Sequence, residues 1–167
     1  LIFQPDMVLI SFGGNDPLQV FISDKEFMKR NFLRHIQWDK SLIRLKIGQF
    51  IISFWDRFFT KRNDSLVPRV SFKEYQENLH EIIRLSKERN IKVILLTRPI
   101  LVDYEVFIPK YNSVTIEVAK INDILVIDLY SYFKDKKDYF FDHAHFNENG
   151  HREAARLIYE SILSLLN

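Results

Sequence analysis

The sequence contains no cysteine. This absence excludes disulfide bonds, thiol nucleophiles and cysteine-ligated metals, although it does not define the compartment. There is also no apolar run of the roughly 20 residues that a membrane-spanning helix needs. Internal repeats, low-complexity tracts and Gly/Ser-rich linkers are likewise missing. With 47% hydrophobic and 28% charged residues, the sequence predicts a single globular domain over residues 1–167.

Charge is unevenly distributed along the chain. The net charge is only +2, yet the stretch from Asp24 to Arg62 holds ten Lys/Arg and four Asp/Glu, a local balance of +6. The remaining residues therefore sum to −4. A basic stretch of this kind is typical of a solvated helical face, or of a surface that meets an anionic partner or substrate. We predict no nucleic-acid partner.

Apolar strand patterns alternate with amphipathic helix patterns. The run Met7–Phe12, between Pro5 and Gly13, predicts a central parallel strand buried on both faces, and further strands are predicted at Lys92–Thr97 and Ile124–Asp128. Helical spacing predicts helices between and after these strands. Their expected buried residues are Tyr75, Leu79, Ile82, Ile83 and Ser86, then Tyr111, Val114, Val118 and Ile121, then Ala154, Ile158, Ile162 and Leu165. This order predicts an α/β fold with helices on both faces of a parallel sheet.

An acid and two histidines lie within four positions, just before the last helical pattern. Asp142 and His145 have the D-x-x-H spacing, which lets the carboxylate reach the Nδ1 proton of the imidazole within one loop. A carboxylate in that position fixes the tautomer and stabilises the imidazolium, leaving Nε2 as a general base. A pair of solvated loop histidines, His143 and His145, is the alternative interpretation.

A polar turn follows the first predicted strand. Gly13, Gly14, Asn15 and Asp16 form a G-x-N-D sequence, and the end of a parallel strand is where open α/β sheets bind ligands. The Asn15 amide is a potential hydrogen-bond donor to a developing oxyanion. The same residues are also ordinary turn formers.

Together, the G-x-N-D turn and Asp142-x-x-His145 resemble two blocks of the SGNH (GDSL-like) hydrolase family, in the same order. The strands between them and the sequence from His145 to His151 extend the resemblance over nearly the whole chain. The resemblance implies a three-layer, flavodoxin-like sheet, of which this chain supplies the last three strands, and acyl transfer to a serine. His145 would be the base, Asp142 its orienting partner and Asn15 an oxyanion donor, supported by Gly13 and Asp16, with no metal or organic cofactor. The substrate would be a small-molecule or glycan acyl ester.

The nucleophile of that family is the main departure. The family carries its serine in a Gly-Asp-Ser block before the G-x-N-D turn, and none of the eleven serines here follows Gly-Asp. We therefore expect the domain to be N-terminally incomplete, with its first strands and its nucleophile outside this chain. A degenerate relative that has lost the nucleophile is the alternative. Ser11 is expected inside the buried strand, facing the sheet rather than the site.

Residues 23–62 are predicted to be a helical insertion. Ser23-x-x-Glu26 is a capping-box pattern, and a second helix is predicted over Ser41–Phe59. This helix could cover the active site, pack on the domain, or make a peripheral membrane contact. The last option favours an extracytoplasmic or membrane-associated location.

Two other function classes stay open at this point. A metal-dependent phosphoesterase would use Asn15, Asp16, His143 and His145, but the upstream D-x-H of such enzymes is missing. A catalytically inactive binding module, membrane-associated through Ser41–Phe59, is the stronger alternative. Arg98, at the end of its strand, is expected to make a surface ion pair or to contact substrate. Asp128, at the end of the next strand, is expected to support a loop.

Overall fold

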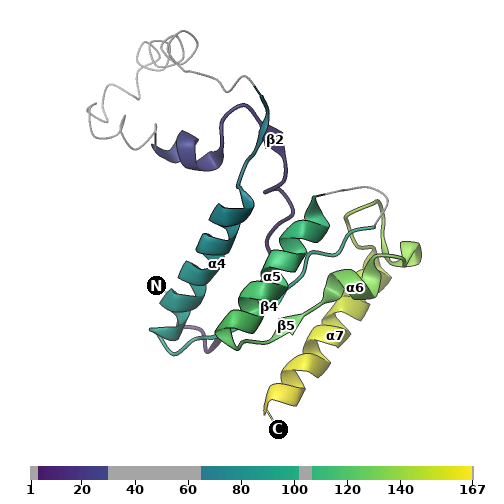
Figure 1. Ribbon diagram of the computed structural model, residues 1–167. Helices are drawn as coiled ribbons and strands as arrows, with labels where there is room; N and C mark the ends of the chain where they lie inside the picture. Colours follow the sequence, from purple (N-terminus) through teal and green to yellow (C-terminus); the bar gives the residue numbers. More distant parts are fainter. Residues whose placement is uncertain (1–3, 30–64, 102–106, 167) are drawn as a thin grey trace, which may run out of the picture. The chain divides into compact units, whose positions relative to one another are not determined.

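The computed structural model describes residues 4–29, 65–101 and 107–166 (Figure 1). The chain divides into two compact units. The first unit comprises Leu1–Pro17 and Phe72–Asn167, and the second comprises Leu18–Ser71. Most of the predicted insertion, including residues 41–59, lies outside the described residues, so its boundaries and its membrane contact stay predictions. Among the described residues, no helix is both long enough and apolar enough to cross a bilayer.

A three-stranded parallel sheet forms the centre of the first unit. Its order is β1 (Met7–Ile10), β4 (Lys92–Leu96) and β5 (Val126–Ile127). Leu9 pairs with Ile94, and Leu96 pairs with Ile127. The parallel register brings the carboxyl ends of all three strands to one edge of the sheet, where the loops that follow them meet.

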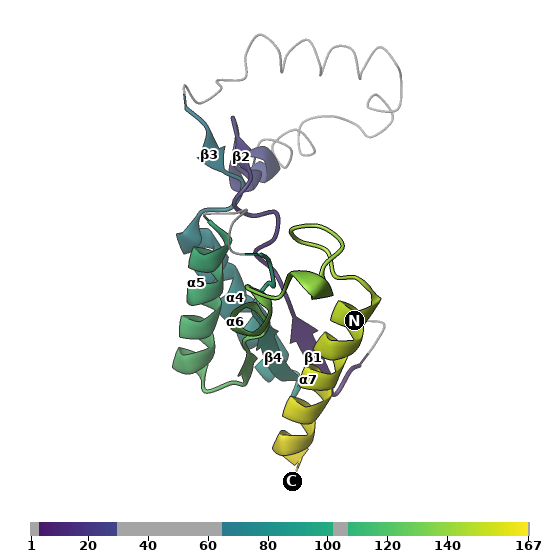
Figure 2. The same cartoon turned by 90° about the vertical axis from the view of Figure 1, so that its right-hand side faces the viewer.

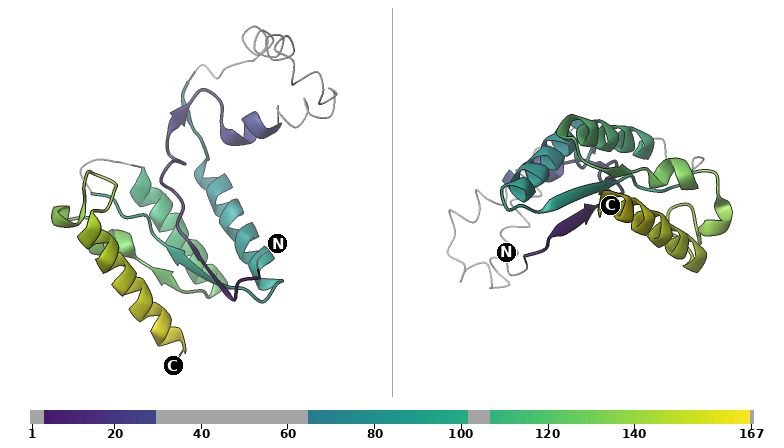
Figure 3. Two further views of the ribbon diagram at one scale, coloured as in Figure 1. Left: turned by 180° about the vertical axis from the view of Figure 1, so that it is seen from behind. Right: turned by 90° about the horizontal axis from the view of Figure 1, so that it is seen from below.

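Helices cover both faces of this sheet. Helices α4 (Phe72–Lys87) and α5 (Ile108–Asn122) lie on one face, and α7 (Glu148–Leu166) lies on the other (Figures 2 and 3). Side chains of β4 alternate between the two layers, as the two-residue period of a strand requires. Ile94 and Leu96 join a core cluster with Ala154 of α7. The predicted α/β class, with a parallel sheet between helical layers, is confirmed. Whether further strands precede β1 stays a prediction.

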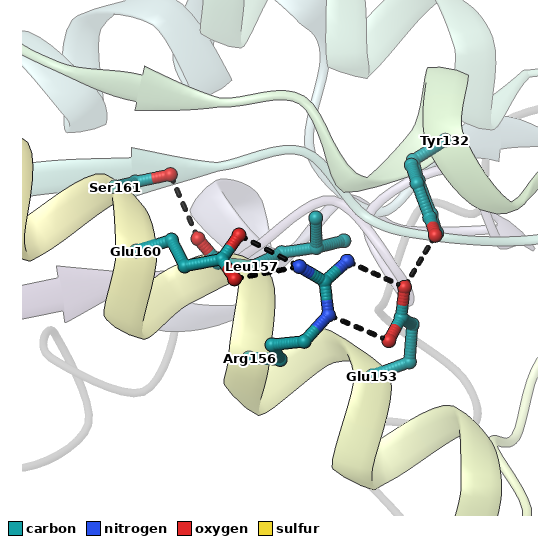
Figure 4. Close-up of polar contacts among 6 residues, drawn as sticks. All are labelled: Tyr132, Glu153, Arg156, Leu157, Glu160 and Ser161. Carbon is teal, nitrogen blue, oxygen red and sulfur yellow. Dashed lines mark hydrogen bonds and ion pairs between the residues drawn. The ribbon is translucent and has the colours of Figure 1, made fainter.

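Polar contacts attach α7 to the short helix α6 (Leu129–Phe133). The Tyr132 hydroxyl donates to Glu153, which also accepts two hydrogen bonds from Arg156 at 2.8 and 2.9 Å (Figure 4). Arg156 first, and Tyr132 second, lower the pKa of Glu153 to about 2. The ammonium of Lys136 lies 3.1 Å from the centre of the Tyr132 ring. The exposed ion pair of Arg156 with Glu153 contributes little to the stability of the fold.

The second unit contains a two-stranded antiparallel sheet. Strands β2 (Gln19–Val20) and β3 (Val67–Pro68) pair within it. Arg69 makes a bidentate ion pair with Asp24, with N–O distances of 2.9 and 3.1 Å. A helix covers residues 24–29, and the Glu26 amide donates to the Ser23 hydroxyl at 3.4 Å. The predicted helix start at Ser23 is confirmed.

Residues with a left-handed backbone follow two helices of the first unit. They are Asn90 after α4 (φ 57°) and Asp123 after α5 (φ 52°). Four apolar residues predicted to be buried are instead exposed, namely Leu9 (42%), Phe12 (52%), Ile121 (61%) and Leu165 (48%). Phe12 lies beyond the end of β1. Leu9 is exposed because β1 pairs with only one strand, β4, in the described part of the sheet. Ile121 and Leu165 lie in the last turns of their helices, where α5 and α7 extend beyond the core.

Candidate active site

The D-x-x-H loop, residues 140–146, brings a carboxylate onto an imidazole. His145 Nδ1 lies 2.8 Å from Asp142 Oδ2 and 3.0 Å from Oδ1. His145 Nε2 has no hydrogen-bond partner in the described part of the chain, and 70% of the His145 side chain is exposed. The predicted contact between Asp142 and Nδ1 is confirmed. The imidazole therefore presents a free Nε2 to a substrate or a nucleophile.

Asp142 is held by backbone as well as by the imidazole. Its Oδ1 accepts the amide hydrogens of Ala144 and His145, each at 2.8 Å. The Ala144 amide, followed by the His145 side chain and amide, lowers the pKa of Asp142 to about 2. Hydrogen bonds to the charged form of a carboxylate depress its pKa in this way. Asp142 is therefore ionised throughout the neutral range, as an orienting acid must be.

The ends of this loop are closed against helix α7. Phe140 and Phe146 form an antiparallel bridge, and the Phe141 amide donates to the His145 carbonyl at 2.8 Å. Asn147 caps α7, because its Oδ1 accepts the Gly150 amide at 3.0 Å. Gly150 lies so close to the loop that a Cβ atom there would overlap the Tyr139 carbonyl oxygen and lie 2.7 Å from Cδ1 of Phe146. Only glycine fits at this contact.

Two tyrosines, Tyr75 and Tyr111, pack against the G-x-N-D turn. Gly13 has φ of +91°, and a Cβ atom on it would lie 3.3 Å from Cβ of Tyr111 and 3.4 Å from the Tyr75 hydroxyl. The Gly13 amide donates to Asp16 Oδ2 at 3.0 Å. Burial first, and the charge of Asp16 second, raise the pKa of Tyr111 to about 12. Gly13 and Asp16 thus shape the turn, as predicted from its turn-forming residues.

One cavity of about 350 Å³ joins the turn and the D-x-x-H loop. Asn15, Arg98, His143 and His145 all contribute to its wall. Asn15 is exposed, and its amide has no hydrogen-bond partner among the described residues. The structure therefore brings together the two sequence blocks that lie 130 positions apart, with Asn15 and His145 on the same cavity.

The prediction for Ser11 is wrong. Strand β1 ends at Ile10, so Ser11 is exposed and lines the cavity instead of facing the sheet. The apolar run Met7–Phe12 predicted a strand two residues longer than the one that forms, since the pairing of β1 with β4 ends at Ile10. No hydrogen bond joins Ser11 to His145 in the described part of the chain.

The sequence did not predict a pair of hydrogen bonds between the buried Asn112 side chain and the backbone of Arg98. Asn112 of α5 is only 2% exposed, and its side-chain amide donates to the Arg98 carbonyl at 2.9 Å and accepts the Arg98 amide at 2.7 Å. Helical spacing marks a polar residue at 112 but gives no partner for it. The contact requires the loop after β4 to pack on α5, which no local pattern reveals.

Asp128 supports its loop, as predicted. Its Oδ1 accepts Thr97 Oγ1 at 2.8 Å and the Ser131 amide at 3.1 Å, which caps α6. The Oδ1 atom of Asp128 is therefore already hydrogen-bonded to Thr97 and to the start of α6.

The residues of the alternative metal site form no cluster of three or more His, Asp or Glu ligands within the described ranges.

Comparison with known families decides the assignment. The model of the GDSL-like lipase/acylhydrolase family matches residues 1–153. The chain belongs to this family. Membership agrees with the resemblance drawn from the G-x-N-D turn and from Asp142 and His145. No curated protein sequence matches the chain significantly.

Solved structures with a similar fold include three hydrolases. A point mutant of an acetyl-xylooligosaccharide esterase from Geobacillus has a TM-score of 0.58 and 18% identity, and the match covers 95% of this chain and 60% of that one. An α/β hydrolase from the metagenome of Lake Arreo, Spain, has a TM-score of 0.52 and 17% identity, and the match covers 93% of this chain and 58% of that one. An acetyl xylan esterase has a TM-score of 0.52 and 16% identity, and the match covers 93% of this chain and 98% of that one. At these identities the likeness shows the SGNH fold alone. The chain spans about three fifths of the first two structures.

Proposed function

We propose that this chain is the His-Asp part of a serine-dependent hydrolase or acyltransferase that acts on O-acyl esters. The observation that carries the proposal is the shared cavity lined by Asn15 and His145. Within the described residues, the His145 Nε2 atom and the Asn15 amide have no hydrogen-bond partner, and the ionised Asp142 binds Nδ1 of the same imidazole. Family membership supports the same chemistry.

Each group has a definite task in the proposed reaction. His145 Nε2 takes the proton of the serine hydroxyl as its oxygen attacks the acyl carbonyl, and then gives a proton to the departing alcohol oxygen. Asp142 holds the imidazole in the productive tautomer. The Asn15 amide donates to the oxyanion that forms. Water or a second alcohol then accepts the acyl group, and no metal or cofactor is required.

The nucleophile is proposed to come from sequence upstream of Leu1. None of the serines here has the Gly-Asp-Ser context of the family. Ser11 lines the cavity without a bond to His145 and is therefore the serine to test within the chain.

The acyl ester is proposed to lie on a carbohydrate or a lipid. Two of the similar folds are esterases of acetylated xylan or xylooligosaccharides, so an acetylated sugar is the first substrate to test. An inactive binding module with the same fold remains the competing function, and a complete protein that hydrolyses no ester would support it.

Replacing Asn15 tests the oxyanion role. In the protein extended upstream through its nucleophile, Asn15→Ala should lower kcat by about 10²–10³-fold and change KM little, because the contact strengthens in the transition state. Steady-state kinetics on acetylated xylooligosaccharides would measure both constants. Asn149→Ala, on the outer surface of α7, is the matched control. If Asn15→Ala changes only KM, Asn15 is a binding or turn residue.

A further inference from the structure

The guanidinium group of Arg98 has no partner among the described residues. The side chain is half-buried, lines the cavity of Asn15 and His145, and makes no hydrogen bond or ion pair with any residue of the chain that the structure describes. Its Nε lies 3.4 Å from the position that a Cβ atom on Gly14 would occupy. Arginines that are partly withdrawn from water normally lie against a carboxylate or another acceptor.

The backbone of Arg98 is fixed on both sides. Asn112 binds its amide and its carbonyl, as described above. The preceding residue, Thr97, is completely buried and accepts the Tyr130 amide at 2.8 Å. The following residue, Pro99, is buried as well. The backbone of Arg98 is therefore held in place at the cavity wall, although no described residue pairs with the charge of its side chain.

The carboxylates of the same site already have partners. Asp16 accepts the Gly13 amide, and Asp142 binds the imidazole of His145 and two amides. Because neither carboxylate pairs with Arg98, the positive charge stays available to a bound molecule. A guanidinium presents two parallel N–H donors, which match the oxygens of a carboxylate or a phosphate.

We propose that Arg98 selects acyl esters that carry an anionic group, a carboxylate or a phosphate, close to the ester bond. Asn112 is then a positioning residue that sets the direction of Arg98. This inference rests on the proposed esterase function, and it narrows the substrate to acylated acidic sugars or similar anionic esters.

Paired substrates test the selectivity. In the full-length protein, the ratio of kcat/KM for 4-nitrophenyl hemisuccinate over 4-nitrophenyl butyrate should fall about ten- to a hundredfold in Arg98→Ala, since a hydrogen-bonded charge pair is lost. The same ratio of kcat/KM would be measured for a phosphate-bearing ester over its neutral counterpart. Arg98→Lys should keep part of the selectivity, because the charge remains without the planar fork. Arg89→Ala, just beyond the C-terminal end of α4, is the control and should leave the ratio unchanged.

Binding provides a readout that needs no catalysis. The NMR signal of the Arg98 Nε–H group should shift on addition of succinate or inorganic phosphate, but not on addition of succinamide. The compound that shifts the signal shows whether the site binds a carboxylate or a phosphate. Asn112→Ala should weaken that binding. If the ester ratio is the same in Arg98→Ala and Arg89→Ala, or no anion shifts the signal, the inference is wrong. Arg98-dependent anion binding in a protein without esterase activity would retain the anion site and contradict the proposed function.

Discussion

His145→Ala should lower kcat of the full-length protein by about 10⁴-fold or more, and Asp142→Ala should have an effect of similar order. The double variant should lose little beyond the single ones. His145 cannot act as a base without a ring, and without Asp142 the ring loses both its tautomer and its position, because a single carboxylate holds Nδ1 and two loop amides. Single-turnover and steady-state kinetics on one ester would measure these losses.

His143→Ala is the matched control for this pair. His143 lies two residues from His145 and lines the same cavity, but Asp142 binds His145 and not His143. Its replacement should therefore be far milder. Equal and large losses at both histidines would contradict the Asp-His assignment and return the metal-dependent phosphoesterase to consideration, with activity in the presence of a chelator as the next measurement.

Gly150→Ala should reduce the free energy of unfolding by about 3 kcal/mol, whereas the same exchange in an ordinary helix stabilises by about 0.5–1 kcal/mol. The reversed sign comes from the added methyl group, which would overlap the Tyr139 carbonyl oxygen and crowd Phe146. Both residues adjoin the bridge that closes the D-x-x-H loop. Activity should therefore fall together with stability, because His145 directly precedes Phe146. Chemical denaturation followed by circular dichroism gives the stability.

The other glycines of the site supply the controls for this exchange. Gly13→Ala should cost about 1–3 kcal/mol, because φ is +91° there. Gly14→Ala should change stability by less than about 0.5 kcal/mol, since its new methyl group meets Arg98 at an ordinary distance of 3.4 Å. If all three variants lost the same stability, a general effect of the added methyl group, and not the contact at Tyr139, would explain the loss at Gly150.

Local patterns predicted the elements of the fold but not their limits. The apolar runs of β1, β4 and β5 depend on neighbours within a few positions, and the structure confirms these strands. Helix α6 was not predicted, because its five residues directly follow the predicted strand Ile124–Asp128 and are too few to show a helical period. Burial failed at Leu9 and Leu165, since exposure depends on which distant elements cover a residue, and no periodicity records that.

The candidate site divides in the same way. Asp142 and His145 lie three residues apart, so one loop contains their whole contact and spacing was enough to predict it. Asn112 and Arg98 belong to different elements, and their hydrogen bonds exist only because α5 packs beside the end of β4. Ser11 entered the cavity because β1 ends two residues earlier than its apolar pattern predicted.

Labelling with a fluorophosphonate tests the central claim most directly, because this reagent reacts with a serine that an adjacent histidine has activated. Residues 1–167 and a protein extended upstream through a Gly-Asp-Ser block would be treated side by side, with His145→Ala and Ser11→Ala variants of each, and the modified residue located by mass spectrometry. We expect no label on residues 1–167, and one labelled serine upstream of Leu1 whose labelling depends on His145. A label on Ser11, or on any other serine of residues 1–167, together with retained ester turnover, would contradict it.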